Sequence, residues 1–191
     1  MIETFKQLSD ELNGKLQVQK SRWYDGYAYF PLNCYELNFE YQTAQVNIFY
    51  ENRDSEFSKP SALDSGLFGS RHICEITCKL STENTCLPPF RLEGRGYFKR
   101  IFYPFDKPNY ALKCKEKHFS KWLDKNKELY SIYKIVENSS EFEPLMIGKI
   151  IRGKSNPRYE LRIAYNTQRS KKEIIEMLVT FLKAILRYKK G

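Results

Sequence analysis

Alternating apolar and polar residues predict most of the strands in this chain. Residues 35–41 are the clearest case, because aromatic or leucine side chains alternate there with Glu, Asn and Glu. This is the two-residue period of a strand with one buried and one wet face. A hairpin is expected where a strand from Leu16 turns at Asp25-Gly26 and returns through Phe30. Six further segments are expected to be strands: 46–50, 72–80, 110–114, 130–136, 145–151 and 158–165.

Three segments show the spacing of a helix instead. The first, at 2–12, repeats an apolar residue at three- and four-residue steps and stops at Asn13-Gly14. The second is expected at about 116–128, with its aromatic residues on one side. The third begins at a capping box, Ser170 to Glu173, and carries a broad apolar stripe that is expected to lie against the sheet.

The order of these elements predicts an α+β fold. It combines mainly antiparallel sheet with an N-terminal helix, a middle helix and a long C-terminal helix, since most strand connections are too short for parallel crossovers. One domain, 1–191, is the expectation at this length. The polar segment 51–70 is expected to be a long loop. Residues 81–95, which contain Pro88-Pro89 and Gly94, are a second expected loop and a possible subdomain seam.

Charge is divided unevenly along the chain, whose net charge is +9. Residues 1–90 hold 8 Lys/Arg and 12 Asp/Glu, whereas residues 91–191 hold 24 and 11. This asymmetry indicates a basic surface in the C-terminal half that could meet nucleic acid, another polyanion or an acidic protein. The alternative is a solvated, lysine-rich surface without a ligand. No apolar run predicts a membrane span and no signal peptide is recognised, so a cytoplasmic location is expected.

Candidate nucleic-acid contacts come from the two most basic stretches, 91–127 and 149–172. In the first, aromatic and basic residues interleave on a segment extended in pattern, as single-strand binding requires when bases stack on rings and cations hold phosphates. The same pattern also fits an ordinary amphipathic strand. Arg95-Gly96-Tyr97 matches the RNA-binding consensus of RRM domains poorly, because charged residues follow the aromatic. The candidate set is Arg95, Tyr97, Lys99, Arg100, Arg152, Arg158 and Arg162.

Two enzymatic interpretations stay open beside the binding one. Asp64 and Glu75, with Lys79, are similar to the carboxylates and lysine of metal-dependent nucleases, although the lysine is two positions too far along. The pairs His72/Cys74 and Cys114/His118 have spacings that a thiol nucleophile and its base could use. We expect a non-enzymatic binding module. The alternatives are a small-ligand or protein-interaction domain without a nucleic-acid role, and a hydrolase or nuclease using Asp64 and Glu75.

Cysteine and histidine usage argues against bound metal. The chain has five cysteines and two histidines, and no C-x-x-C pair. Cys74 and Cys78 are four residues apart on an expected strand, which is too far for a disulfide. Free thiols, no metal and no cofactor are therefore expected, and the oligomeric state stays open.

The C-terminal half resembles several uncharacterised bacterial protein families. The resemblance covers about half of the chain and rests on a loose pattern of four features. They are Phe102-Tyr-Pro-Phe-Asp106 ahead of Tyr110-Ala-Leu-Lys113, the helix with Trp122-Leu123, the strand from Tyr159 to Ile163, and the apolar last helix. Those families have no assigned activity. The resemblance therefore implies a bacterial cytosolic or membrane-peripheral context and assigns no catalytic residue.

Overall fold

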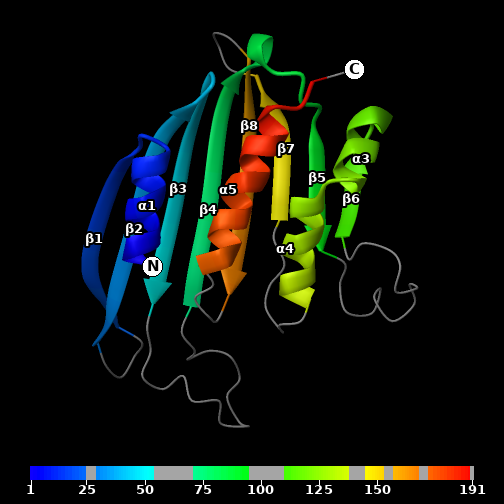
Figure 1. Cartoon of the computed structure of the whole chain (residues 1–191). Coiled ribbons are helices and arrows are strands. Elements are labelled where there is room, and N and C mark those ends of the chain that lie inside the picture. Colours follow the sequence, from blue (N-terminus) through cyan, green and yellow to red (C-terminus); the bar gives the residue numbers. More distant parts are fainter. Residues whose placement is uncertain are drawn as a thin grey trace.

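An eight-stranded antiparallel sheet with helices against one face is the framework of the molecule (Figure 1). The computed structural model describes residues 1–24, 29–53, 71–94, 110–137, 145–152, 157–167 and 172–189. The strands run in the order β1-β2-β3-β4-β8-β7-β5-β6, so that β8, late in the sequence, lies between β4 and β7. Their bounds are β1 (Lys15–Tyr24), β2 (Tyr29–Tyr41), β3 (Ala44–Arg53), β4 (Arg71–Ser81), β5 (Phe90–Gly94), β6 (Tyr110–Cys114), β7 (Leu145–Ile151) and β8 (Arg158–Thr167).

The described residues form four α-helices, all on the same side of the sheet (Figure 1). They are α1 (Ile2–Glu11), α3 (Lys117–Asp124), α4 (Lys127–Glu137) and α5 (Lys172–Leu186), and a single 3-10 turn, η1 (Thr82–Asn84), follows β4. This confirms the α+β layout with antiparallel sheet. The C-terminal helix has 15 residues, which is about four turns. None of the described helices is long and apolar enough to span a bilayer.

One continuous row of buried side chains holds the sheet to the helices. Leu37 on β2 pairs with Ile48 on β3, and the row continues with one paired residue on each strand as far as β5. Each member is at most 1% exposed, so each contributes about 1.5–3 kcal/mol by leaving water. The helix side of the core is closed by α5, whose Leu178 and Phe181 are fully buried as the apolar stripe predicts. The row consists of Leu37, Ile48, Ile76, Ile163, Met146 and Leu92.

The opposite face of the sheet, which we call the open face, is polar. Alternate residues of each strand point there, because the side-chain period of a strand is two. Reading across from β2 to β6, one row of paired positions on this face holds Asn38, Asn47, Thr77, Arg162, Ile147, Arg91 and Lys113. The alternation predicted for β2, β4 and β8 is therefore confirmed.

Four expectations about local structure are wrong. The single helix expected at about 116–128 is two helices, because α3 ends at Asp124 and α4 begins at Lys127. The segment 130–136 is helical, within α4, whose Leu129 and Ile132 are buried on one helix face. Asn126 caps this helix by accepting a 2.8 Å hydrogen bond from the backbone N–H of Leu129. The expected loop 81–95 contains β5, which pairs with both β6 and β7. The return strand of the first hairpin does not stop near Phe30 but continues to Tyr41 as one strand of 13 residues.

The side chains of Tyr159 on β8 and Phe90 on β5 pack closely against Gly148 on β7. A Cβ atom on Gly148 would lie 1.9 Å from the hydroxyl oxygen of Tyr159 and 2.6 Å from Cε1 of Phe90. The Tyr159 hydroxyl donates a 2.9 Å hydrogen bond to the carbonyl oxygen of Pro88. Only glycine therefore fits at position 148.

Candidate nucleic-acid interface

The structure describes three of the seven residues that the sequence nominates for nucleic-acid contact. Arg95, Tyr97, Lys99 and Arg100 lie outside the described residues. The other three are exposed and lie on or next to two neighbouring strands. Among them, Arg158 and Arg162 share the open face of β8, and Arg152 directly follows β7.

Arg162 is already engaged within the protein. Its Nε and Nη2 atoms donate to the two carboxylate oxygens of Glu75 on β4, both at 2.8 Å. These hydrogen bonds raise the pKa of Arg162 above its usual value. Its charge is therefore largely matched, and a phosphate would have to compete with a two-point partner.

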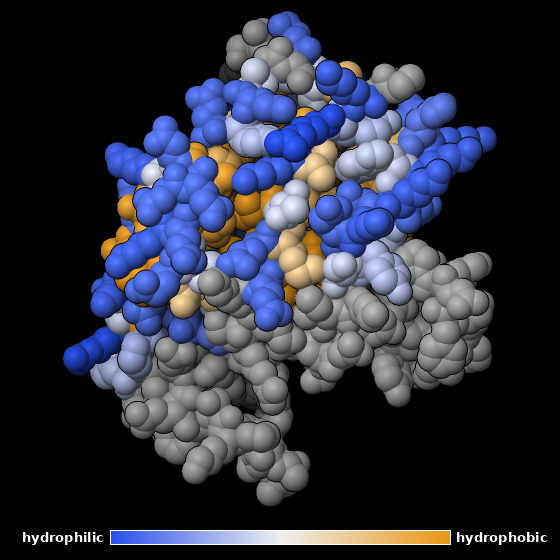
Figure 2. Space-filling model, viewed as in Figure 1, coloured by the Kyte–Doolittle hydropathy of each residue, from blue (hydrophilic) through white to orange (hydrophobic). Residues whose placement is uncertain are grey.

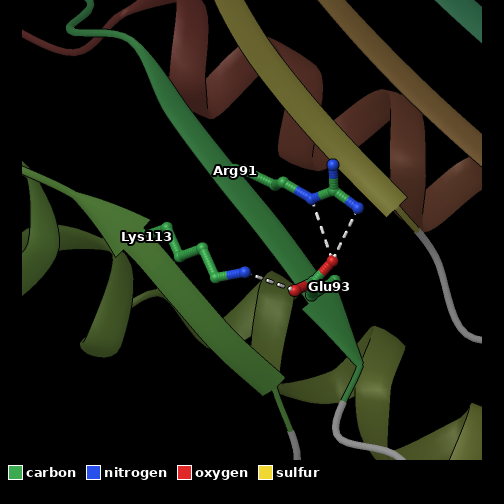
Figure 3. Close-up of polar contacts among 3 residues, drawn as sticks. All are labelled: Arg91, Glu93 and Lys113. Atoms are coloured by element: carbon green, nitrogen blue, oxygen red, sulfur yellow. Dashed lines mark hydrogen bonds and ion pairs between the residues drawn. The ribbon is translucent and has the colours of Figure 1, made fainter.

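A second ion-pair cluster joins β5 and β6 on the open face (Figure 3). Glu93 accepts hydrogen bonds from Lys113 Nζ at 3.0 Å and from Arg91 Nε at 2.9 Å. Lys113 first, and Arg91 next, hold the pKa of the Glu93 carboxyl below its ordinary value. Further along the sheet, Lys149 Nζ lies 3.3 Å from Glu160. Much of the positive charge on the open face is thus balanced locally by carboxylates.

The lysines on and beside α3 are different. Lys117, Lys121 and Lys125 follow one another at four-residue steps, so they form a stripe on one side of the helix. Flanking lysines at both ends extend this stripe, and the region over α3 is covered by hydrophilic side chains (Figure 2). Within the described residues no ion pair involves any of these side chains, and all are exposed. We call this set the lysine surface: Lys115, Lys117, Lys121, Lys125 and Lys127.

Aromatic packing fixes α3 in place beneath the lysine surface. Phe119 is fully buried, and its ring centroid lies 5.1 Å from that of Phe90 and 5.0 Å from that of Tyr188. Trp122 stacks on Phe119 at 5.8 Å and contacts Tyr188 at 5.3 Å. These contacts tie the helix to β5 and to the residues that follow α5, so the lysine stripe lies on a helix anchored in the core.

A hollow of about 660 Å³ adjoins the lysine surface. Three cations line it, Arg91, Lys113 and Lys115, together with Glu116 and the Pro88–Phe90 segment. Arg91 and Lys113 share Glu93, whereas Lys115 forms no ion pair within the part of the chain that the structure describes. The hollow links the lysine surface to the open face of the sheet.

The nuclease interpretation finds no support among the described residues. Asp64 lies outside them, and both carboxylate oxygens of Glu75 accept hydrogen bonds from Arg162. In the part of the chain that the structure describes, no cluster of three or more His, Cys, Asp or Glu side chains is arranged to hold a metal ion. Lys79 is exposed on the same face of β4 as Glu75.

The His72/Cys74 pair on β4 is also poorly suited to nucleophilic catalysis. Cys74 is buried, and this burial, with a smaller contribution from Glu75, raises its pKa to about 12. His72 is buried too, and its Nδ1 is hydrogen-bonded to the Tyr50 hydroxyl at 2.7 Å. A thiol with so high a pKa stays protonated at neutral pH, whereas a nucleophile must be a thiolate.

The other cysteines behave as ordinary side chains. Cys78 is buried and its pKa is likewise raised to about 12. The Cys114 sulfur accepts a 3.4 Å hydrogen bond from the backbone N–H of Glu116, and Cys86 is exposed. All five cysteines are free.

No family model, curated protein or solved structure matches this chain. The functional argument therefore rests on the site itself. Within it, sequence reasoning counted the lysines of the basic stretch 91–127 but did not single out the stripe on α3. The four-residue spacing of Lys117, Lys121 and Lys125, inside a segment expected to be helical, is the signal that could have found it.

Proposed function

We propose that this protein is a non-enzymatic module that binds polyanions, nucleic acid foremost, through the lysine surface. The observation that supports this is that five exposed lysines on and beside α3 have no carboxylate partner among the described residues, in contrast to the paired cations of the open face. Lysines without ion-pair partners can neutralise phosphates, and this releases the counterions condensed on the nucleic acid. Arg95, Tyr97, Lys99, Arg100, Arg152 and Arg158 remain candidates to extend the contact.

Lysines are point charges that hold phosphates without reading bases. Binding should therefore be insensitive to sequence, with a Kd on the order of 10⁻⁴–10⁻⁶ M near physiological salt. The logarithm of the affinity should fall linearly with the logarithm of salt, by about 0.7 per contacted phosphate on single strands and about 0.9 on duplexes.

The test is a fluorescence-anisotropy titration of labelled single-stranded DNA, duplex DNA and RNA at several salt concentrations. The variant Lys117→Glu/Lys121→Glu/Lys125→Glu should lose at least about tenfold in affinity, with a shallower salt dependence. The matched control makes the same change in net charge at the opposite side of the molecule: Lys6→Glu/Lys15→Glu/Lys20→Glu. All six positions are exposed, so both variants should fold.

The control should retain most of the affinity, because its charges lie away from the proposed contact. Equal losses in the two variants would mean that only net charge matters, and the lysine surface would not be the site. Failure of the parent protein to bind any of the three nucleic acids at low salt would reject the proposal altogether.

A second candidate function, binding of a small polar ligand, is favoured by a hollow of about 650 Å³ on the open face of β2, β3 and β4. Asn47 Nδ2 donates to Glu36 Oε1 at 2.7 Å and to Asn38 Oδ1 at 2.8 Å, which fixes three polar side chains in the lining. Lys79 stands at its rim without an ion pair among the described residues. Thermal-shift screening of polar metabolites against the parent and Asn47→Ala would test this. A compound that raises the Tm of the parent but not of Asn47→Ala supports the candidate function, and a screen that finds no such compound counts against it.

A further inference from the structure

The outer side of β1 is a long strand edge without a partner in the described part of the chain. β1 pairs with β2 over ten residues, from Lys15 opposite Asn38 to Tyr24 opposite Tyr29. It is the first strand of the sheet and lies beyond α1 at the left edge in Figure 1. Eight of its ten residues are exposed. An edge strand of this kind presents outward-pointing N–H and C=O groups that can pair with another extended chain.

The side chains along this edge form a defined pattern. Val18, Lys20, Arg22 and Tyr24 alternate along the strand and therefore share one face, the face of the buried Tyr35 that pairs with Val18. Val18 is 41% exposed and Tyr24 is 56% exposed. The row thus reads apolar, cationic, cationic, aromatic, and it is open to solvent.

Helix α1 leaves this row uncovered because its buried face is directed further into the sheet. The Phe5 ring lies 5.4 Å from that of Tyr35 on β2 and 5.8 Å from that of Tyr50 on β3. Both partners belong to the second and third strands and neither to β1. Although α1 also approaches β1, the row from Val18 to Tyr24 stays exposed beside it.

Charge selects the kind of strand that can pair here. β1 carries Lys15, Lys20 and Arg22 and no carboxylate, and none of the three forms an ion pair with the rest of the described protein. A second copy of β1 would bring six cations into one pair of strands, and like charges across a ladder are destabilising. A strand with carboxylates opposite Lys20 and Arg22 would instead gain from cross-strand ion pairs.

We propose that the edge of β1 binds an extended acidic segment of a partner protein as an additional strand. Main-chain hydrogen bonds to β1 hold the segment, and its alternate side chains give specificity. The partner side chains that face the Val18–Tyr24 row are apolar opposite Val18 and Tyr24 and acidic opposite Lys20 and Arg22. Because this pattern is the same in both directions, it fits a parallel or an antiparallel strand.

The test uses a fluorescent, end-capped synthetic peptide in which Val, Glu, Glu and Val alternate with Thr. Anisotropy should show saturable binding, weakened at least about tenfold by Lys20→Glu/Arg22→Glu. The same peptide with Lys in place of Glu, and a version N-methylated at alternate residues, should not bind. Amide hydrogen exchange should show new protection confined to β1, which a contact through side-chain charge alone would not produce.

The matched control for the variant is Lys121→Glu/Lys125→Glu, which makes the same charge change on the lysine surface. It should leave peptide affinity unchanged while weakening nucleic-acid binding, so the two proposals fail separately. Absence of peptide binding, equal binding to the Lys20→Glu/Arg22→Glu variant, or new protection elsewhere than β1 would overturn the acidic-strand proposal. Sedimentation of the protein alone as a dimer that Lys20→Gln/Arg22→Gln strengthens, by removing the repelling cations, would assign the edge to a second copy instead.

Discussion

Replacing Gly148 by alanine tests the closest packing contact in the core. The added methyl carbon would lie 1.9 Å from Tyr159 Oη and 2.6 Å from Phe90 Cε1. Neither ring has space to move away, since Tyr159 is fully buried and Phe90 is only 4% exposed. Phe90 is moreover packed against Phe119, with ring centroids 5.1 Å apart. The methyl group must therefore displace the Tyr159 hydroxyl from the Pro88 carbonyl or separate β7 from β8.

The cost follows from these contacts. Overpacking a core usually costs about 1–3 kcal/mol, and loss of the Tyr159–Pro88 hydrogen bond adds about 0.5–1.5 kcal/mol. The lower entropy of alanine in the unfolded chain offsets about 0.4–1 kcal/mol. We expect the free energy of unfolding to fall by about 2–3 kcal/mol, which for a chain of this size lowers the Tm by roughly 4–12 °C.

Urea unfolding followed by tryptophan fluorescence measures this loss, since Trp122 packs on Phe119 next to the altered contact. A double-mutant cycle with Tyr159→Phe isolates the hydroxyl contact. Gly148→Ala should cost about 1 kcal/mol less in the Tyr159→Phe background, where the hydroxyl is already gone. A Gly148→Ala protein within about 0.5 kcal/mol of the parent, or effects that simply add, would refute the packing argument.

Three further predictions concern the core and its thiols. Phe181→Ala should lower the free energy of unfolding by about 3–5 kcal/mol in urea, because Phe181 is fully buried. Thr180→Ala, on the exposed side of α5, should stay within about 1 kcal/mol of the parent, and equal effects would mean that α5 does not pack on the sheet. In native protein at pH 8, a thiol reagent should label the exposed Cys86 first and leave Cys74 and Cys78 protected until unfolding; rapid labelling of Cys74 would contradict its burial. Burial raises the pKa of Cys74 and Cys78 from 9.0 to about 12, so the stability that these protonated thiols contribute is complete below pH 9 and is lost as the pH rises toward 12, by up to about 1.4 kcal/mol per pH unit for each thiol. The urea midpoint should therefore decline less steeply between pH 8 and 11 in Cys74→Ala/Cys78→Ala than in the parent. Parallel profiles would count against the raised pKa values.

Local pattern was sufficient for elements whose two faces differ in environment. β2, β4 and β8 each have one face under helices and one toward water, so their alternation is visible in the sequence. The aromatic and β-branched residues of α4 favour a strand, whereas the three-residue spacing of the buried Leu129 and Ile132 and the cap at Asn126 fit the helix that forms. β5 is short and follows two prolines, and it is a strand because β6 and β7 pair with it.

The candidate site shows the same division. The lysine stripe of α3 is local, because it depends only on four-residue spacing in a helix. The loss of Arg162 as a free phosphate ligand is not local, because Glu75 stands 87 residues earlier in the chain. That pairing depends on the register in which Thr77 lies opposite Arg162. No periodicity within either strand contains this information.

The position of β8 between β4 and β7 has a consequence for how the protein forms during synthesis. The meander β1–β4 can pair as soon as it is made, and so can β5 with β6. These two parts become one sheet only when residues 158–167 are available to join them. Until then the inner edge of β4, with Cys74, Ile76 and Cys78, has no strand beside it. Nascent chains that end before residue 158 should therefore depend on chaperones, because this exposed edge can pair with other chains.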